Sequence, residues 1–174
     1  MQGIDSTQYV DDKAAIGTLA HQMIADHLRG VETDTSDYSA KQIDQAENSL
    51  LSYFEWAKTH TIEPVLIEVP LVSEAYGYGG TIDCLAQLDG KLQLLDFKTG
   101  KGIWPEMVLQ LAAYLQLLTE HGHVIHTGWI LRVGRDETEG FETRLYKSLA
   151  TQWEIFTHCL AIYCLQREVK KGGY

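Results

Sequence analysis

The stretch GTIDCLAQLDGKLQLLDFKTG, residues 80–100, decides the fold expected of this chain. Two apolar-rich runs flank the dipeptide Asp89-Gly90. Asp-Gly between such runs is a strong signal for a β-hairpin closed by a two-residue type I′ turn, in which both central residues need positive φ. Such a turn pairs Leu88 with Lys91. The sequence therefore predicts a hairpin whose register is set by its turn.

The same register places two carboxylates, Asp83 and Asp96, directly opposite each other. Their Cβ atoms are then roughly 5 Å apart, and like charges in that position are destabilising. A bound divalent metal makes the pair favourable, because hard cations such as Mg²⁺ take carboxylate oxygens. Lys98 lies two residues after Asp96 and shares its strand face. Two acids and one ammonium group are thus predicted to converge on one spot.

The alternative is a solvent-exposed hairpin face with scattered charges. Apolar neighbours weigh against it, because idle charge is costly in a mostly buried strand pair. These neighbours are Ile82, Leu94, Leu95 and Phe97.

The composition is that of a globular protein with one domain. A chain of 174 residues, 45% apolar and 22% charged, is long enough for one real core and short for two. No run approaches the roughly 18 apolar residues of a membrane span, and no basic segment precedes an apolar one at the N-terminus. We therefore expect a cytoplasmic protein. The three cysteines, an odd number, do not suggest a disulfide framework, and Cys159 and Cys164 are expected to be packing residues.

The net charge of −10 argues against broad binding to duplex DNA, which rests on a basic surface. Any nucleic-acid contact must come from local basic clusters. The candidates are Lys98, Lys101, Arg167, Lys170 and Lys171.

Helices and strands can be placed around the hairpin. Helical spacing predicts a first helix from a cap at Asp11 or Asp12 to about Leu28. Further helices are expected over 39–59 with Ser39 as cap, over 105–120 with Pro105 at the first turn, and over 149–170 as a helix that closes the domain. Strands are expected over 65–72, 123–133 and 141–146. The element order α, α, β, β, β, α, β, β, α predicts an α/β (α+β) fold in which helices flank both sides of one mixed sheet.

Several residues outside the hairpin could serve the same site. His21 lies one turn after Gly17, whose presence in a helix suggests close packing; His21 is either a ligand or an ordinary histidine. Glu68 either faces outward or is aimed at the hairpin acids. Gln110 and Tyr114 share one helix face, as site residues or as a rim residue and a core aromatic. The spacing of His121, His123 and His126 matches no familiar metal site.

These residues, taken in order, resemble the RecB-like branch of the PD-(D/E)XK nuclease superfamily, which includes recombination-type and phage-type exonucleases. The segment from Gly17 to His21 is similar to its first motif, and Gly80 to Asp83 to its G-x-x-D motif. The segment from Asp96 to Gly100 looks like D-[FY]-K-T-G, and Gln110 to Tyr114 looks like Q-x-x-x-Y. The resemblance covers roughly residues 14–120 and implies a restriction-endonuclease-like core in a single domain over 1–174, with strands and a closing helix over 121–171.

The resemblance implies a role for each matching residue. Asp83 and Asp96 would bind Mg²⁺ or Mn²⁺ together with His21 and the Phe97 carbonyl, and Glu68 would contribute through water. Lys98 would orient the attacking water and stabilise charge on the phosphate, and Gln110 and Tyr114 would steady the lysine, the water or the phosphate. Metal Lewis acidity supplies hydroxide near neutral pH and stabilises the developing charge.

The chain departs from some members of this branch. Its iron–sulfur members bind their cluster with four cysteines, whereas this chain has three, so no iron–sulfur cluster is expected here. Many relatives carry more sequence ahead of the first motif than the dozen or so residues found here, and a protein partner or a homo-oligomer would be compatible with that difference.

The resulting hypothesis is a metal-dependent DNA nuclease, an exonuclease acting on ends or single strands in recombination, repair or phage DNA processing. The alternatives are a catalytically silent nuclease-fold subunit that binds DNA ends, and an endonuclease.

Overall fold

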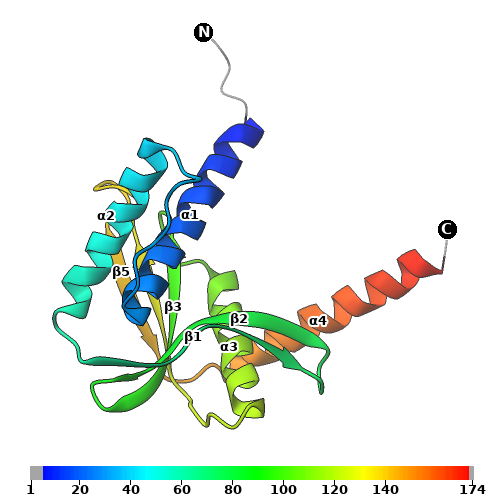
Figure 1. The fold of residues 1–174 in the computed structure, drawn as a ribbon. Coiled ribbons are helices and arrows are strands. Elements are labelled where there is room, and N and C mark those ends of the chain that lie inside the picture. Colours follow the sequence, from blue (N-terminus) through cyan, green and yellow to red (C-terminus); the bar gives the residue numbers. More distant parts are fainter. Residues whose placement is uncertain (1–5, 173–174) are drawn as a thin grey trace.

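The computed structural model describes residues 6–172, which form four helices and five strands (Figure 1). In chain order these are α1 (Ser6–Arg29), α2 (Ala40–Ala57), β1 (Ile62–Ser73), β2 (Tyr78–Leu88), β3 (Lys91–Thr99), α3 (Pro105–Glu120), β4 (Gly128–Val133), β5 (Phe141–Tyr146) and α4 (Ala150–Lys171).

The five strands form one mixed sheet in the order β1-β2-β3-β4-β5. Every neighbouring pair is antiparallel except β3 and β4, which are parallel and joined by α3. A parallel pair needs such a crossover, because a short turn cannot return the chain to the same end of the sheet. The predicted mixed sheet and α+β class are confirmed.

Two hydrophobic cores lie on opposite faces of this sheet. Residues of α1 and α2, among them Ile24 and Tyr53, pack with Leu95 and Phe97 of β3. Residues of α3, among them Leu111, pack on the other face. Figure 1 shows α3 apart from the α1–α2 pair. Helices therefore cover both faces, as predicted.

The hairpin has the predicted turn. Asp89 and Gly90 have φ of +51° and +77°, as a type I′ turn requires. Its register is also confirmed from Leu88–Lys91 as far as Cys84–Leu95. The Asp89 carboxylate also makes contacts outside the hairpin. It accepts a hydrogen bond of 2.8 Å from the backbone amide of Thr61 and lies 2.7 Å from His60 Nδ1. The tip of the hairpin is thus tied to the start of β1.

Some predicted boundaries were wrong. α1 begins at Ser6 rather than after a cap at Asp11 or Asp12, because nothing in the sequence between them breaks a helix. β1 begins at Ile62 and runs through Pro64, which lies on an edge strand where a missing amide is tolerated. β4 begins only at Gly128, so the residues from His123 to Thr127 form a loop.

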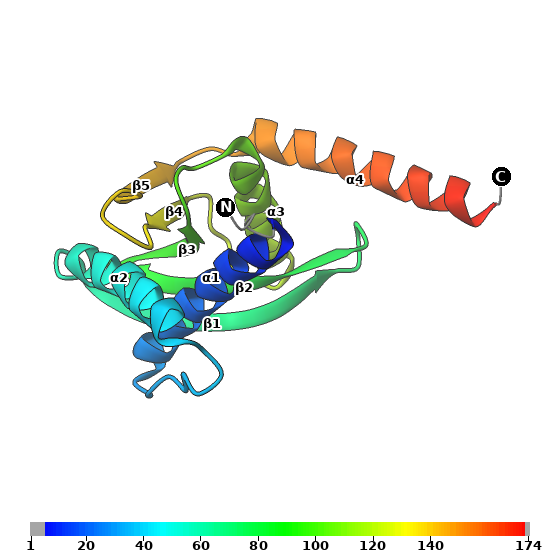
Figure 2. The ribbon, with the colours of Figure 1, turned by 90° about the horizontal axis from the view of Figure 1, so that it is seen from above.

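The prediction that the last helix closes the domain was also wrong. α4 has no buried residue and projects away from the sheet (Figures 1 and 2). Only its first turns pack on the rest of the chain, through Trp153 and Phe156. Further along, Ile162 and Leu165 are 56% and 60% exposed. Within residues 6–172, no helix has the length and apolar character needed to cross a membrane.

Candidate active site

The hairpin ladder stops where the two acids would meet. The last paired residues are Cys84 and Leu95, and Asp83 and Asp96 are the next residue on each strand. Instead of continuing the ladder, Asp83 accepts a 2.8 Å hydrogen bond at Oδ2 from the backbone amide of Phe97. The predicted cross-strand pair of Asp83 and Asp96 is therefore not part of the ladder, which ends one residue before it.

β2 also loses its regular alternation at this point. Ile82 and Leu85 belong to the same hydrophobic core, on the α3 side, although residues three apart in a regular strand point to opposite faces. Cys84 packs in the core on the α1–α2 side. The irregularity falls on Asp83–Cys84 and gives the Asp83 carboxylate a place at the junction of both faces.

β1 has a matching irregularity opposite Asp83. The pairs Ile67–Cys84 and Val69–Ile82 flank Glu68 and Asp83, which are both left out of the ladder. Glu68 has φ of +52°, in the left-handed region, where a residue other than glycine costs on the order of 1–3 kcal/mol. Of the two orientations that the sequence left open for Glu68, the structure has the one aimed at the hairpin acids.

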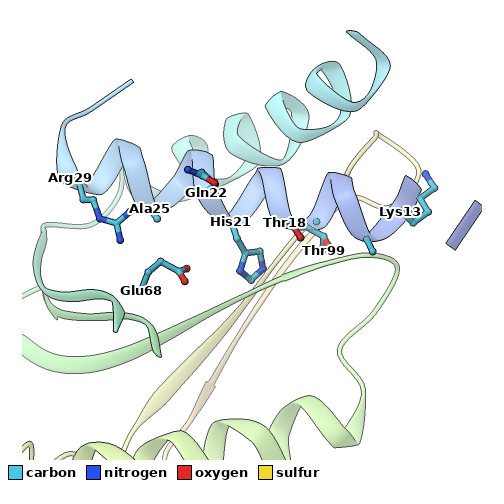
Figure 3. Close-up of a pocket in the computed structure, with 10 residues that line it drawn as sticks. Lys13, Thr18, His21, Gln22, Ala25, Arg29, Glu68 and Thr99 are labelled. Atoms are coloured by element: carbon cyan, nitrogen blue, oxygen red, sulfur yellow. The ribbon is translucent and has the colours of Figure 1, made fainter. Parts of the chain in front are cut away.

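His21, Glu68 and Asp83 form a group that could hold a metal ion. One potential ligand atom from each lies within 4.8 Å of the others, and His21 Nδ1 is 3.7 Å from Asp83 Oδ2. Figure 3 shows His21 and Glu68 beneath α1, with their side chains directed into the same space. The helix α1 and the consecutive strands β1 and β2 thus bring an imidazole and two carboxylates to one place.

Asp96 is fully buried and contacts the predicted lysine. Lys98 Nζ donates a 2.9 Å hydrogen bond to Asp96 Oδ1 and lies 2.8 Å from Oδ2. The geometry of the second contact is not that of a hydrogen bond, so among the described residues Oδ2 has no hydrogen-bond partner. The Lys98 ammonium offsets the charge of Asp96 but not also that of the nearby Asp83, and uncompensated buried charge is costly. A divalent cation would offset it, and carboxylates and an imidazole are ligands that divalent metal ions take in proteins.

Burial sets the protonation of this cluster. It raises the pKa of Glu68 to about 7, with a further contribution from Asp83, and it raises the pKa values of Asp83 and Asp96 against the attraction of Lys98. Burial and then Lys98 lower the pKa of His21 to about 4, while the charge of Asp96 and the hydrogen bond to the Phe97 backbone act in the opposite direction. The imidazole is therefore neutral at pH 7. It can bind a metal in this form, but it does not offset the negative charge of the carboxylates.

Two glycines of the predicted motifs are explained by close contacts. A Cβ atom on Gly80 would lie 2.6 Å from Cε1 of Tyr114, and one on Gly17 would lie 2.9 Å from Oγ1 of Thr99. Tyr114 also accepts a 2.9 Å hydrogen bond at its hydroxyl from Gln110 Nε2. Its pKa is raised by burial and then by the charges of Asp83 and Asp96. The Gln110–Tyr114 pair thus lies beside the acids, packed against the start of β2.

A groove of about 600 Å³ runs along α1 past this cluster, with His21 and Glu68 in its wall. Lys13 and Arg29 also line it (Figure 3). Arg29 donates hydrogen bonds to the Ile67 carbonyl at 3.1 Å and to Asp26 at 3.2 Å. Neither basic residue is among the site residues predicted from the sequence. Helical spacing could have found them, because residues 13, 17, 21, 25 and 29 are each four apart and follow one face of α1.

Other candidate ligands are not brought to the site. Within residues 6–172, the metal-compatible group contains only His21, Glu68 and Asp83, so the predicted ligand Asp96 lies outside it, as do His121, His123 and His126. His121 instead contacts the Leu117 carbonyl at the end of α3, at 2.8 Å. Cys84 is buried, but Cys159 and Cys164 are exposed on α4, which contradicts the prediction that they are packing residues.

One comparison with a solved structure supports the fold. A crystal structure of a protein from Eubacterium rectale named "Putative exonuclease" aligns over 91% of this chain and 69% of its own, with a TM-score of 0.56 and 12% identity. A crystal structure of SSO0001 aligns over 95% and 87%, with a TM-score of 0.43 and 15% identity. No curated protein matches the sequence significantly. The sequence itself matches the PD-(D/E)XK nuclease superfamily over residues 2–152, and with most of its length matched the chain belongs to that superfamily.

Proposed function

We propose that this protein is a metal-dependent deoxyribonuclease of the RecB-like branch, and that residues 1–174 form a single nuclease domain. The observation that carries the proposal is a pair of buried carboxylates, Asp83 and Asp96, that share one ammonium group, Lys98, which lies 2.8 Å from Asp96 Oδ2. One ammonium group does not balance two buried carboxylates, and a bound divalent cation would offset the remaining charge. Nucleases of this superfamily usually use divalent metals, which fits the donor set.

In this proposal Asp83, Asp96, His21 and the Phe97 carbonyl hold Mg²⁺ or Mn²⁺, and Glu68 contributes through water. When bound, the metal lowers the pKa of water and polarises a phosphoryl oxygen. Lys98, fixed 2.9 Å from Asp96 Oδ1, is placed to orient the attacking water and to stabilise charge on the phosphate. Gln110 holds the Tyr114 hydroxyl and steadies this arrangement.

We infer an exonuclease that acts on DNA ends or single strands, in recombination, repair or phage DNA processing. The net charge of −10 supports this choice, because a broad duplex-binding surface would need an excess of basic residues. The basic side chains Lys13 and Arg29 line the groove along α1, which suits a local contact with one strand.

The test is degradation of linear and closed circular DNA in Mg²⁺ or Mn²⁺ by the wild type, Asp96→Ala and the control Asp44→Ala. Asp44 is an exposed acid on α2, away from the site. We expect the wild type and Asp44→Ala to degrade linear DNA, and Asp96→Ala to lose at least 100-fold in rate. Equal activity of wild type and Asp96→Ala would overturn the site, and rapid cutting of circular DNA would identify an endonuclease.

A catalytically silent, end-binding subunit is the alternative. It would bind DNA ends without cleavage in any divalent metal. Calorimetric titration with Mn²⁺ distinguishes this subunit from a nuclease that was simply not given its substrate. In a nuclease, Asp83→Asn should weaken Mn²⁺ binding. A silent subunit does not need the metal, so Asp83→Asn should leave its titration unchanged.

A further inference from the structure

A second cavity lies directly beside the proposed catalytic centre. It has a volume of about 490 Å³, within the range of small-molecule pockets, and lies between α3, the start of β2 and the first turns of α4. Its wall includes Gln110 and Tyr114, the pair already placed next to the acids. Whatever occupies this cavity therefore lies next to the group on which the proposed chemistry acts.

Aromatic rings line the side of the cavity away from the acids. Tyr78 and Phe156 both contribute to the lining, with ring centroids 4.9 Å apart. Tyr78 is held in place because its hydroxyl donates a 2.8 Å hydrogen bond to the Ala113 carbonyl. Trp153 stacks behind Phe156, with centroids 5.6 Å apart and planes inclined by 20°. The rings are thus fixed before any ligand binds, which reduces the entropy lost on binding.

The charge of the lining argues against a phosphate in this cavity. Among the described residues that form the wall, none is a lysine or arginine, and Glu106 supplies a carboxylate. Leu109 and Ala113 add apolar surface. A flat, neutral group with polar edges suits such a wall: its faces can stack on the rings, and its amino groups can donate to Glu106 or to the Gln110 side-chain oxygen.

We propose that this cavity receives the base of an unpaired nucleotide adjacent to the phosphate that the proposed metal site at Asp83 and Asp96 would bind. The proposal rests on the proposed function and names its substrate more closely, as single-stranded nucleic acid. Proteins that bind single strands stack successive bases on aromatic side chains. A base inside a duplex is stacked on both faces, so neither face is free to stack on a protein side chain. Paired DNA would therefore have to be opened first.

The first test is binding of a fluorescent single-stranded oligonucleotide in Ca²⁺, followed by anisotropy, with a gel to verify that the strand stays intact. Phe156→Ala removes a stacking surface, and Leu109→Trp fills the cavity without deleting any of its wall. We expect each to weaken binding by about 5- to 150-fold. Ile155→Ala is the matched control, because Ile155 is next to Phe156 on α4 but 44% exposed and outside the cavity wall. It should bind like the wild type.

The second test removes one base at a time from the oligonucleotide. With the wild type, an abasic site at one position should weaken binding, and with Phe156→Ala the same abasic site should have little further effect, because the interaction is already lost. The proposal is overturned if Leu109→Trp binds like the wild type, or if no single abasic position distinguishes wild type from Phe156→Ala. The rings would then serve only to hold α4 against β2.

These outcomes are separate from failure of the proposed function. If the wild type and Asp96→Ala degrade DNA equally, the catalytic assignment fails whatever the anisotropy shows. If Asp96→Ala loses activity and the abasic scan shows no position-specific effect, the nuclease assignment stands and the base-binding cavity does not.

Discussion

At the scale of single residues, Glu68 is where stability and function conflict most clearly. Its backbone is in the left-handed region, and burial together with Asp83 raises the pKa of its carboxyl from 4.5 to about 7. A group whose pKa is raised in the folded state stabilises the fold below its unfolded pKa, and this contribution is lost as the pH rises through the folded pKa. The stability of the metal-free protein should therefore fall progressively as the pH rises from about 4.5 to 7, because of Glu68.

Glu68→Gln removes that titration. We expect the free energy of unfolding of the metal-free variant to fall less steeply from pH 4.5 to 7 than that of the wild type, with a difference of about 1–2 kcal/mol after allowance for partial exposure. Urea unfolding in EDTA at several pH values measures it. Parallel curves for the two proteins would contradict the assignment. Glu63→Gln, an exposed acid on the same strand, is the control.

Gly80 provides a second prediction at this scale. Alanine at this position would bring a Cβ atom within 2.6 Å of the Tyr114 ring, which is not a flexible side-chain end, so we expect a loss of about 1–3 kcal/mol in unfolding free energy. In the double variant with Tyr114→Ala the cost of Gly80→Ala should largely disappear. Additive costs in this double-mutant cycle would mean that the contact is not the reason for the glycine.

At the scale of elements, α1 acts on the site through Arg29 as well as through His21. Arg29 donates to the Ile67 carbonyl, next to the strained Glu68, and its charge lowers the pKa of Glu68 against the effect of burial. Arg29→Met should therefore reduce Mn²⁺ affinity at pH 7 by about 10- to 100-fold, as loss of a residue supporting a metal ligand commonly does. Arg29→Lys should recover part of the loss, because it restores charge near Glu68. Calorimetric titration measures both, and an unchanged affinity in Arg29→Met would refute this role.

The elements also show what the sequence could and could not predict. The hairpin register and the cap at Ser39 follow from local chemistry: two positive φ angles at Asp89-Gly90, and a capping box with Gln42. The irregularities at Glu68 and Asp83 could not be predicted, because no local pattern in the sequence marks them. Helical spacing could have placed Arg29 on the same helix face as His21, but not its contact with the Ile67 carbonyl, which lies 38 residues away and is fixed only by the fold.

At the scale of the whole molecule, α4 shows the limit of apolar patterns. Apolar residues occur on all sides of this helix, and spacing alone does not show which of them find partners. The structure gives contacts to Trp153 and Phe156 and leaves the outer half exposed. The stability of the protein should therefore reside in the sheet and its two cores, and the outer half of α4 should contribute little to it.

Two leucine truncations test this distribution. Leu94 in β3 is fully buried between β3 and α3, so Leu94→Ala should lower the unfolding free energy by about 2–5 kcal/mol. Leu165 is 60% exposed on α4, so Leu165→Ala should change it by less than about 0.5 kcal/mol. Denaturant unfolding gives both values, and amide exchange should be fast in the outer half of α4 and slow in β3. A cost for Leu165→Ala that approaches that of Leu94→Ala, with slow exchange around it, would show that the outer half of α4 is covered in solution. The sheet and its two cores would then not be the sole source of stability, and the outer half of α4 would contribute to it as well.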